Sequence, residues 1–135
     1  MIIEVTRQAS FCAGHRYWRA DWSVEKNHEI FGACANASGH GHNYTLEVTL
    51  SGPVDPATGM VVNLSELDRV IQTQVIDRLD HRNLNADIPE LADVIPTTEV
   101  LAGFIWDQLA PHISRGRLVR VRIAESNHLW AERSE

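Results

Sequence analysis

Residues 40–50 constrain the fold most, because two histidines lead directly into a regular alternation of apolar and polar residues. The apolar set is Tyr44, Leu46, Val48 and Leu50, and the polar set is Asn43, Thr45, Glu47 and Thr49. This period of two predicts a strand with one buried face. His40 and His42 share the apolar parity, so both imidazoles should project from the same face at the start of the strand. There they could share one metal ion, although such a pair alone is also typical of surface or hydrogen-bonded histidines.

A strand expected over residues 2–11 supplies a third histidine with the same orientation. Its apolar parity is set by Ile3, Val5, Ala9 and Phe11, and continues through Ala13 to His15. If the first two strands pair antiparallel, the end of one lies beside the start of the other. His15 should therefore meet His40 and His42. Three imidazoles on one inward face predict a metal site, and zinc is the ion that best suits an all-nitrogen tetrahedral set.

The connection over residues 16–39 is long, and connections of this length are usually functional. It carries Cys34, six residues before His40. A small buried hydrophobe is the structural alternative for this cysteine. The same connection holds the basic residues Arg16, Arg19 and Lys26. Together with Arg82, further along the chain, they are candidates for contacts to an anionic group.

Two amphipathic helices are expected after the second strand. The first follows a turn-rich segment and has an apolar stripe at helical spacing formed by Leu64, Leu67, Val70, Ile71, Val75 and Leu79. It ends at Asp80 and His81. The histidine there can be either a partner of the helix dipole or, with Asp80, an acid–base group.

The second helix should begin at Pro96–Glu99, with Thr97 or Thr98 as its N-cap and Glu99 in its first turn. Its free N–H groups and hydroxyls could bind a polar ligand, or could serve capping alone. A third strand over residues 118–125 gives Val119, Val121 and Ile123 one parity, so Glu125 should project inward with them. A buried carboxylate needs a partner, so Glu125 should meet an internal cation or anchor a ligand.

Charge and cysteine content exclude several classes of protein. The net charge is −6, and the eleven arginines and one lysine form no basic run, so we expect no nucleic-acid interface. No apolar run is long enough for a membrane span, and residues 1–8 lack the pattern of a signal peptide. Two cysteines provide no disulfide framework, which favours free thiols and a cytoplasmic location. The length of 135 residues fits a single domain over residues 1–135.

Six motifs in order along nearly the whole chain resemble one enzyme family. They are FCAGH, FGACANASGHGHNY, DPATGMVVNL, LDHRNLN, PTTE and the late Glu125. Each motif is modest alone, but the ordered set is similar to the 6-pyruvoyl-tetrahydropterin synthases and their relatives, the 6-carboxy-tetrahydropterin synthases.

The resemblance implies an α+β tunnelling fold (T-fold), with a four-stranded antiparallel sheet and two helices on one face in the order ββααββ. The three strands and two helices expected above, followed by a short last strand expected over residues 128–132, have the same order. The family's trimers close their sheets into a barrel, and two trimers stack into a homohexamer with active sites between subunits. Closure makes physical sense because a lone sheet would expose its edges.

The resemblance also assigns roles to particular residues. The zinc ligands correspond to His15, His40 and His42. The catalytic triad, assembled from neighbouring subunits, corresponds to Cys34, Asp80 and His81. The residues that contact the pterin correspond to Glu125, Thr97, Thr98 and Glu99. Cys12 stands where serine is common, and because its parity points away from the zinc we expect no role for it.

The implied activity is a zinc-dependent lyase reaction on 7,8-dihydroneopterin triphosphate. Loss of triphosphate gives 6-pyruvoyl-tetrahydropterin in tetrahydrobiopterin biosynthesis. The alternative product is 6-carboxy-tetrahydropterin, released with acetaldehyde and triphosphate in queuosine and deazapurine biosynthesis. The six-residue spacing from Cys34 to His40 and the long segment after His15 favour the pyruvoyl type.

A protein of another class remains possible from the sequence. Cys34 is close enough to His40 along the chain to become a fourth zinc ligand, and structural zinc sites are closed in this way. The chain would then be a non-catalytic, zinc-stabilised oligomer that binds pterins.

Overall fold

Two long antiparallel strands form the centre of the molecule. The computed structural model describes residues 1–135, and in it β1 (Ile2–His15) pairs with β2 (His40–Pro53) along its whole length. Ile2 lies opposite Pro53 at one end, and His15 lies opposite His40 at the other. This register confirms the expectation that the end of the first strand lies beside the start of the second.

The sheet has five strands in the order β3-β1-β2-β4-β5. β4 (Arg117–Ser126) and β5 (Leu129–Ser134) extend it antiparallel, whereas β3 (Arg82–Asn83) pairs parallel with β1. The expected four-stranded, purely antiparallel sheet of order ββααββ is therefore incomplete, although the α+β class is confirmed. A strand of two residues has no period, so the alternation of apolar and polar residues could not show β3.

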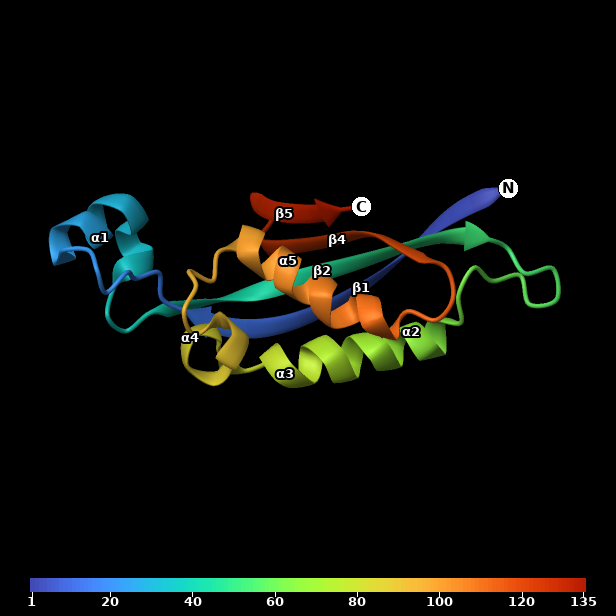
Figure 1. The fold of residues 1–135 in the computed structure, drawn as a ribbon, viewed down its shortest axis with the longest axis horizontal. Coiled ribbons are helices and arrows are strands. Elements are labelled where there is room, and N and C mark those ends of the chain that lie inside the picture. The colour runs from blue at the N-terminus through green and yellow to red at the C-terminus, as the bar shows by residue number, and fades with distance from the viewer.

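Two helical segments cover one face of the sheet (Figure 1). α2 (Leu64–Ile71) continues through a π-helical turn (Gln72–Ile76) into α3 (Asp77–Leu79), and α5 (Thr98–Leu109) is the second segment. The core that they share with the sheet includes Leu67, Ile71, Val75, Leu79, Leu101, Ile105, Tyr44, Leu46, Val48 and Leu50. A regular α-helix has about 3.6 residues per turn, so side chains spaced four apart rotate gradually away from one face. The wider π turn offsets this rotation and keeps the buried side chains on the face that contacts the sheet.

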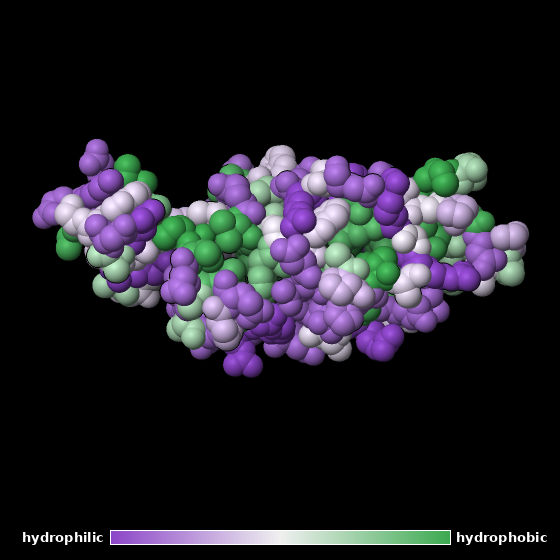
Figure 2. Space-filling view, in the orientation of Figure 1, coloured by the Kyte–Doolittle hydropathy of each residue, from purple (hydrophilic) through white to green (hydrophobic).

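The connection over residues 16–39 is a folded element. It contains α1 (Val24–Phe31), capped by the Ser23 side chain, followed by a 3-10 turn over Gly32–Ala35. The buried Asn27 side chain accepts a hydrogen bond from the Arg19 N–H and donates to the Arg19 carbonyl. This end of the molecule projects from the body, as a largely hydrophilic extension with hydrophobic surface at its foot (Figures 1 and 2).

Short helical turns fill the connection between α3 and α5. They are α4 (Leu84–Asp87) and the 3-10 turn Pro89–Leu91, and a further 3-10 turn, Ala110–His112, follows α5. Asn83 caps α4 by accepting hydrogen bonds from two backbone N–H groups. None of the helices in the structure combines the length and the apolar run needed to cross a membrane.

Two irregularities in the pairing of β4 change which of its side chains face the core. The register with β2 shifts between Thr49 and Leu50, so Leu118, and not Val119, is buried together with Val121 and Ile123. A second shift, between Ala124 and Ser126, falls on Glu125. An extra residue in one strand of a pair changes the direction in which the side chain at that point projects. Glu125 still projects towards the helix-covered side, where its side chain is 17% exposed.

Candidate active site

Three imidazoles meet where β1 ends and β2 begins. The ring centroids are 4.8 Å apart for His15 and His40, 5.1 Å for His15 and His42, and 5.0 Å for His40 and His42. The Nε2 atoms of His15 and His40 are separated by 3.3 Å. Two nitrogens that each bind a tetrahedral zinc at about 2.0–2.1 Å would lie roughly 3.3–3.4 Å apart. The His15 and His40 nitrogens therefore have the spacing of two ligands of one zinc ion, and the His42 ring is their neighbour.

Tyr44 contacts the second nitrogen of the His15 ring. Its hydroxyl lies 3.0 Å from His15 Nδ1, and where Nδ1–H donates to this oxygen, Nε2 is unprotonated and free to bind a metal. His15 is fully buried. Burial, and after it the neighbouring His40 and His42, lower the pKa of His15 to about 4. A neutral imidazole is the form that binds metal, so this ligand is ready at neutral pH.

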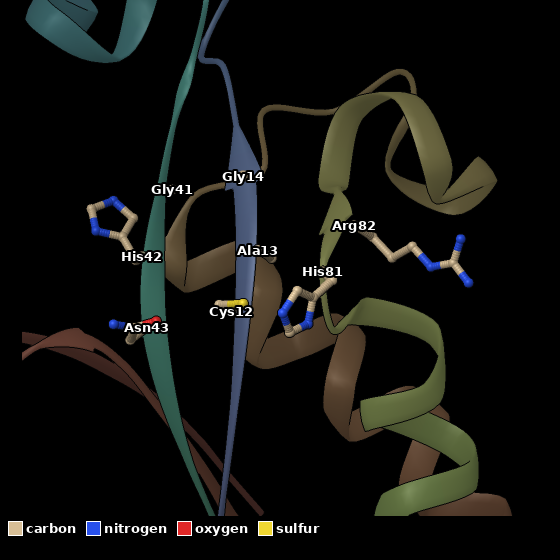
Figure 3. Close-up of a pocket in the computed structure, with 8 residues that line it drawn as sticks. All are labelled: Cys12, Ala13, Gly14, Gly41, His42, Asn43, His81 and Arg82. Carbon is tan, nitrogen blue, oxygen red and sulfur yellow. The ribbon is translucent and has the colours of Figure 1, made fainter.

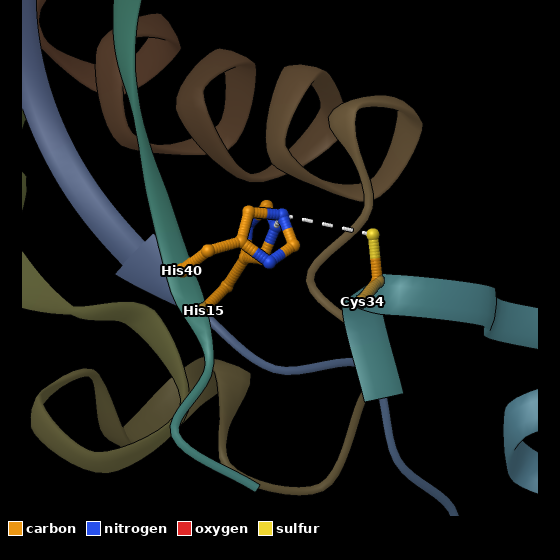
Figure 4. Close-up of side chains that lie close together, drawn as sticks. All are labelled: His15, Cys34 and His40. Carbon is orange, nitrogen blue, oxygen red and sulfur yellow. Dashed lines mark hydrogen bonds between the residues drawn. The ribbon is translucent and has the colours of Figure 1, made fainter. Parts of the chain in front are cut away.

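Cys34 lies beside the imidazoles on the 3-10 turn that follows α1. Its Sγ is 3.7 Å from His40 Nε2 (Figure 4). The ligand atoms of His15, Cys34 and His40 all lie within 4.8 Å of one another. Burial, and next the charge of Glu125, raise the pKa of the Cys34 thiol. A nearby cation offsets such effects, so a metal held by the histidines would favour the thiolate.

A hydrogen bond from Tyr17 fixes the turn that carries Cys34. The Tyr17 N–H donates to the Cys34 carbonyl at 2.8 Å, and the Tyr17 ring packs on His15 with centroids 4.6 Å apart. Sequence reasoning did not select Tyr17, and no parity signal pointed to it because it follows the end of β1. Tyr17 therefore links His15, through its ring, to the turn that carries Cys34, through its backbone.

Glu125 meets both the helix α5 and the histidine cluster. Its Oε2 accepts a hydrogen bond from Thr98 Oγ1 at 2.8 Å and lies 3.8 Å from His42 Nε2. Thr97 has a different use, because its hydroxyl accepts from the Val100 N–H and caps α5. Glu99 follows in the first turn of the helix. The structure thus brings Thr98 and Glu125 into direct contact, and uses the Thr97 side chain as a cap.

Asp80 and His81 form a second cluster, with Cys12. The Asp80 Oδ1 lies 3.0 Å from His81 Nδ1, 3.0 Å from the Cys12 N–H that donates to it, and 3.7 Å from Cys12 Sγ. The Cys12 backbone hydrogen bond is the largest of the effects that hold the pKa of Asp80 below its usual value. Cys12 therefore contacts Asp80 through its backbone N–H and its sulfur, and the expectation that it has no catalytic role stays a prediction.

His81 has an uncommon backbone conformation that turns the chain towards β1. Its φ is +60°, and its N–H donates to the Cys12 carbonyl at 2.7 Å. Few residues other than glycine adopt this region, and such conformations concentrate at functional sites. The sequence could indicate an Asp–His pair at a helix end, but not this turn.

The second cluster borders a cavity of about 350 Å³ (Figure 3). Its lining residues are Cys12, Ala13, Gly14, Gly41, His42, Asn43, His81 and Arg82. Of the basic residues considered for anion contacts, Arg82 is the one at this cavity. Arg19 pairs with Asp21 at 2.6 Å, and Lys26 lies over the Trp22 ring.

Comparisons with known proteins match one enzyme family along nearly the whole chain. Residues 4–135 match the family model described as 6-pyruvoyl tetrahydropterin synthase. The chain is 44% identical over 125 residues to a human protein named 6-pyruvoyl tetrahydrobiopterin synthase, covering 93% of this chain and 86% of that protein. A protein of Archaeoglobus fulgidus named putative 6-carboxy-5,6,7,8-tetrahydropterin synthase is 38% identical over 111 residues, or 82% of this chain and 88% of that protein.

A solved structure shares the fold at higher coverage. The structure of Caenorhabditis elegans 6-pyruvoyl tetrahydropterin synthase superimposes with a TM-score of 0.94 and 35% sequence identity, covering 100% of this chain and 96% of that one.

Proposed function

The chain belongs to the 6-pyruvoyl tetrahydropterin synthase family, and we propose that it is a zinc-dependent lyase that eliminates triphosphate from 7,8-dihydroneopterin triphosphate. The product is 6-pyruvoyl-tetrahydropterin. The observation that carries the proposal is the triangle of three imidazoles, with Cys34 Sγ 3.7 Å from one of them and the Glu125 carboxylate 3.8 Å from another. The residues proposed to hold a metal, to supply a thiol and to anchor a pterin thus lie together.

His15, His40 and His42 would hold the metal. Three protein ligands leave one position open, which is typical of catalytic zinc sites. When bound, zinc supplies a Lewis acid that makes the C–H and O–H bonds of the substrate side chain more acidic. The donor set and the 3.3 Å separation of the His15 and His40 Nε2 atoms support zinc over ions that prefer oxygen ligands.

Glu125 would bind and orient the pterin. The 2-amino-4-oxo edge of a pterin offers two adjacent N–H donors, which suit the two oxygens of one carboxylate. Thr98 donates a hydrogen bond to one Glu125 oxygen and so fixes the plane of the carboxylate. With Thr97 as N-cap and Glu99 in the first turn of α5, this end of the helix would form the wall of the pterin pocket.

Cys34 and the Asp80–His81 pair would move the protons. Cys34, as thiolate, takes a proton from a carbon of the substrate side chain, and triphosphate leaves as the electrons of that C–H bond shift. Asp80 Oδ1 lies 3.0 Å from His81 Nδ1 and accepts its proton in a hydrogen bond. This leaves His81 Nε2 to exchange a proton with the side chain of the substrate. Asp80 also stabilises the imidazolium that this exchange creates.

Within one chain the Asp80–His81 pair contacts Cys12, and Cys34 contacts His40. This arrangement supports a triad in which Cys34 of one subunit meets Asp80 and His81 of a neighbour. The proposal therefore includes the trimer with a closed barrel and its stacking into a homohexamer, in which each site lies between subunits. A cytoplasmic location, expected from the two free cysteines, is also part of it.

The pyruvoyl product is favoured over the carboxy product. The identity to the human pyruvoyl enzyme, 44% over 93% of the chain, exceeds the 38% over 82% found with the putative carboxy enzyme of A. fulgidus. The six-residue spacing from Cys34 to His40 agrees with this choice.

A second candidate function rests on the position of Cys34. Its sulfur is close enough to His40 Nε2 to become a fourth zinc ligand, which would close the site. The chain would then bind pterins without converting them.

Product analysis tests the proposal. Zinc-loaded protein is given 7,8-dihydroneopterin triphosphate, and the products are identified by mass spectrometry, with the Cys34→Ala variant as control. We expect 6-pyruvoyl-tetrahydropterin and triphosphate from the wild type and almost none from the variant. Release of acetaldehyde with 6-carboxy-tetrahydropterin would move the chain to queuosine biosynthesis. Unchanged substrate with zinc bound would favour the non-catalytic alternative.

A further inference from the structure

Cys12, Asp80 and His81 bring three different kinds of metal ligand together. The Cys12 Sγ, an Asp80 oxygen and a His81 ring nitrogen lie within 4.8 Å of one another. Cys12 has the opposite strand parity to Ala13 and His15, so its side chain lies on the other face of β1 from the three imidazoles. Figure 3 shows His81 turned towards Cys12, whereas His42 points away from both. This cluster is therefore separate from the three-histidine site.

Backbone contacts hold the three ligands in place. The Cys12 N–H donates to Asp80 Oδ1 at 3.0 Å, and the His81 N–H donates to the Cys12 carbonyl at 2.7 Å. The parallel pairing of Ala13 with Arg82 ties the next residue of each segment. Because these contacts fix both backbones, a metal ion would need little rearrangement to reach all three side chains.

The cluster is open to ions from solution. Its cavity of about 350 Å³ is large enough for an ion with bound water. The His81 side chain is 79% exposed and the Asp80 side chain 35% exposed. The hydrogen bonds that lower the pKa of Asp80 keep its carboxylate ionised at neutral pH.

We propose that Cys12, Asp80 and His81 form a second metal site, which takes a soft or borderline divalent ion such as Cd²⁺, Zn²⁺ or Co²⁺. Thiolate and imidazole ligands select these ions over Mg²⁺ and Ca²⁺, and one carboxylate completes a mixed set. The ion binds Cys12 as thiolate, so one proton passes to solvent on binding, and no electron transfer is involved. Water fills the remaining positions.

Occupancy of this site would inhibit the enzyme. The ion would bind His81 Nδ1 and Asp80 Oδ1, the two atoms that face each other in the proton-shuttling pair. This consequence rests on the proposed function, because it requires Asp80 and His81 to act on the substrate. The binding itself does not depend on it.

A Co²⁺ titration of the Cys34→Ser variant tests the binding. The chain has two cysteines, so this variant keeps Cys12 as its only thiol. We expect two Co²⁺ per chain and a near-ultraviolet thiolate-to-Co²⁺ charge-transfer band. The matched Cys12→Ser/Cys34→Ser variant should keep one Co²⁺, at the three histidines, and lose the band. His81→Ala in the Cys34→Ser background should weaken the second binding step at least tenfold.

Three results would overturn the proposal. They are the absence of the band in the Cys34→Ser variant, a second Co²⁺ in the variant without cysteines, and unchanged affinity after His81→Ala. A synthase assay with added Cd²⁺ then tests the inhibition. It compares zinc-loaded wild type with the Cys12→Ser variant, each relative to its own rate before Cd²⁺ is added. The Cd²⁺ concentration that halves the rate should be at least tenfold higher for the variant. If the wild type binds two Co²⁺ but makes no product, the second site stands and the proposed function fails.

Discussion

The two clusters on β1 differ in how the chain builds them. The three histidines lie on regular strands, where His15 pairs directly with His40, and His15 is fully buried. Asp80 and His81 lie at a turn with a φ of +60°, and the His81 side chain is 79% exposed. A site fixed by strand register, with one of its three histidines fully buried, can hold a metal before substrate arrives. An exposed pair at a strained turn is better suited to meet a neighbouring subunit and its substrate.

Replacing His81 by glutamine should separate the two clusters most sharply. Loss of a general acid–base group costs about 10²–10⁴-fold in kcat, and the histidine triangle should be unaffected. In protein loaded with one zinc per chain, we therefore expect a large fall in kcat with unchanged zinc content, measured by steady-state assay and elemental analysis. His40→Ala is the control that should lose zinc and activity together. Zinc loss in the His81 variant would show that the clusters are not independent.

Replacing Glu125 by glutamine should weaken pterin binding at the histidine cluster. The change removes the charge of a hydrogen-bond acceptor, worth about 1.5–3 kcal/mol, or roughly 10- to 150-fold in affinity. Fluorescence titration with 7,8-dihydroneopterin measures it. The matched control is Glu47→Gln on the other face of the sheet, where Glu47 pairs with Arg122. Equal affinity for all three proteins would remove Glu125 as the anchor.

Replacing Tyr44 by phenylalanine should weaken zinc binding without removing a ligand. The Tyr44 hydroxyl fixes His15 through Nδ1, and loss of such a partner typically costs about 10–100-fold in metal affinity. Competition with a chelator measures the change. Tyr17→Phe is the matched control, because the Tyr17 ring packs against the His15 ring. Loss of the Tyr17 hydroxyl should leave the zinc affinity unchanged. Equal affinities of the two variants would contradict the role of Tyr44.

Acid should destabilise the metal-free protein through His15. Its pKa in the fold is about 4, below the ordinary 6.5, so between these values the unfolded chain binds a proton that the folded chain does not. The free energy of unfolding should therefore fall as the pH drops from 6.5 to 4, and level off below. The full pKa shift of His15 corresponds to roughly 3 kcal/mol in the free energy of unfolding. We expect a loss of about 1–2 kcal/mol, because the metal-free site can relax.

Urea denaturation of the chelated protein at several pH values measures this effect. His15→Gln should flatten the dependence over the same range. The same slope in the variant would assign the effect to another group.

The sequence predicted the parts of the molecule that have a clear period. β1, β2 and the helix faces follow from alternation and from helical spacing, and strand pairing then brings His15 to His40. The shift at Val119 could not be foreseen, because a bulge inserts one residue without changing composition. β3 and the 3-10 turn carrying Cys34 are too short to show a period.

The second cluster shows where sequence reasoning ends. The parity of Cys12 correctly turned it away from the histidines, but nothing in the sequence showed what lies on the other face of β1. The contact with Asp80 depends on the positive φ of His81 and on the pairing of β3 with β1. These are tertiary features, and no local pattern of residues encodes them. The resemblance to a family supplied the roles of Asp80 and His81, but no role for Cys12.

The central claim is that the two clusters act in one site formed by neighbouring subunits. Cys34→Ala and His81→Gln chains, each inactive alone, can be co-expressed in equal amounts and assayed as mixed oligomers. If each site takes Cys34 from one subunit and His81 from the next, random mixing leaves about one quarter of the sites complete. We predict recovery of activity close to that fraction. Mixed oligomers as inactive as either parent would contradict the account.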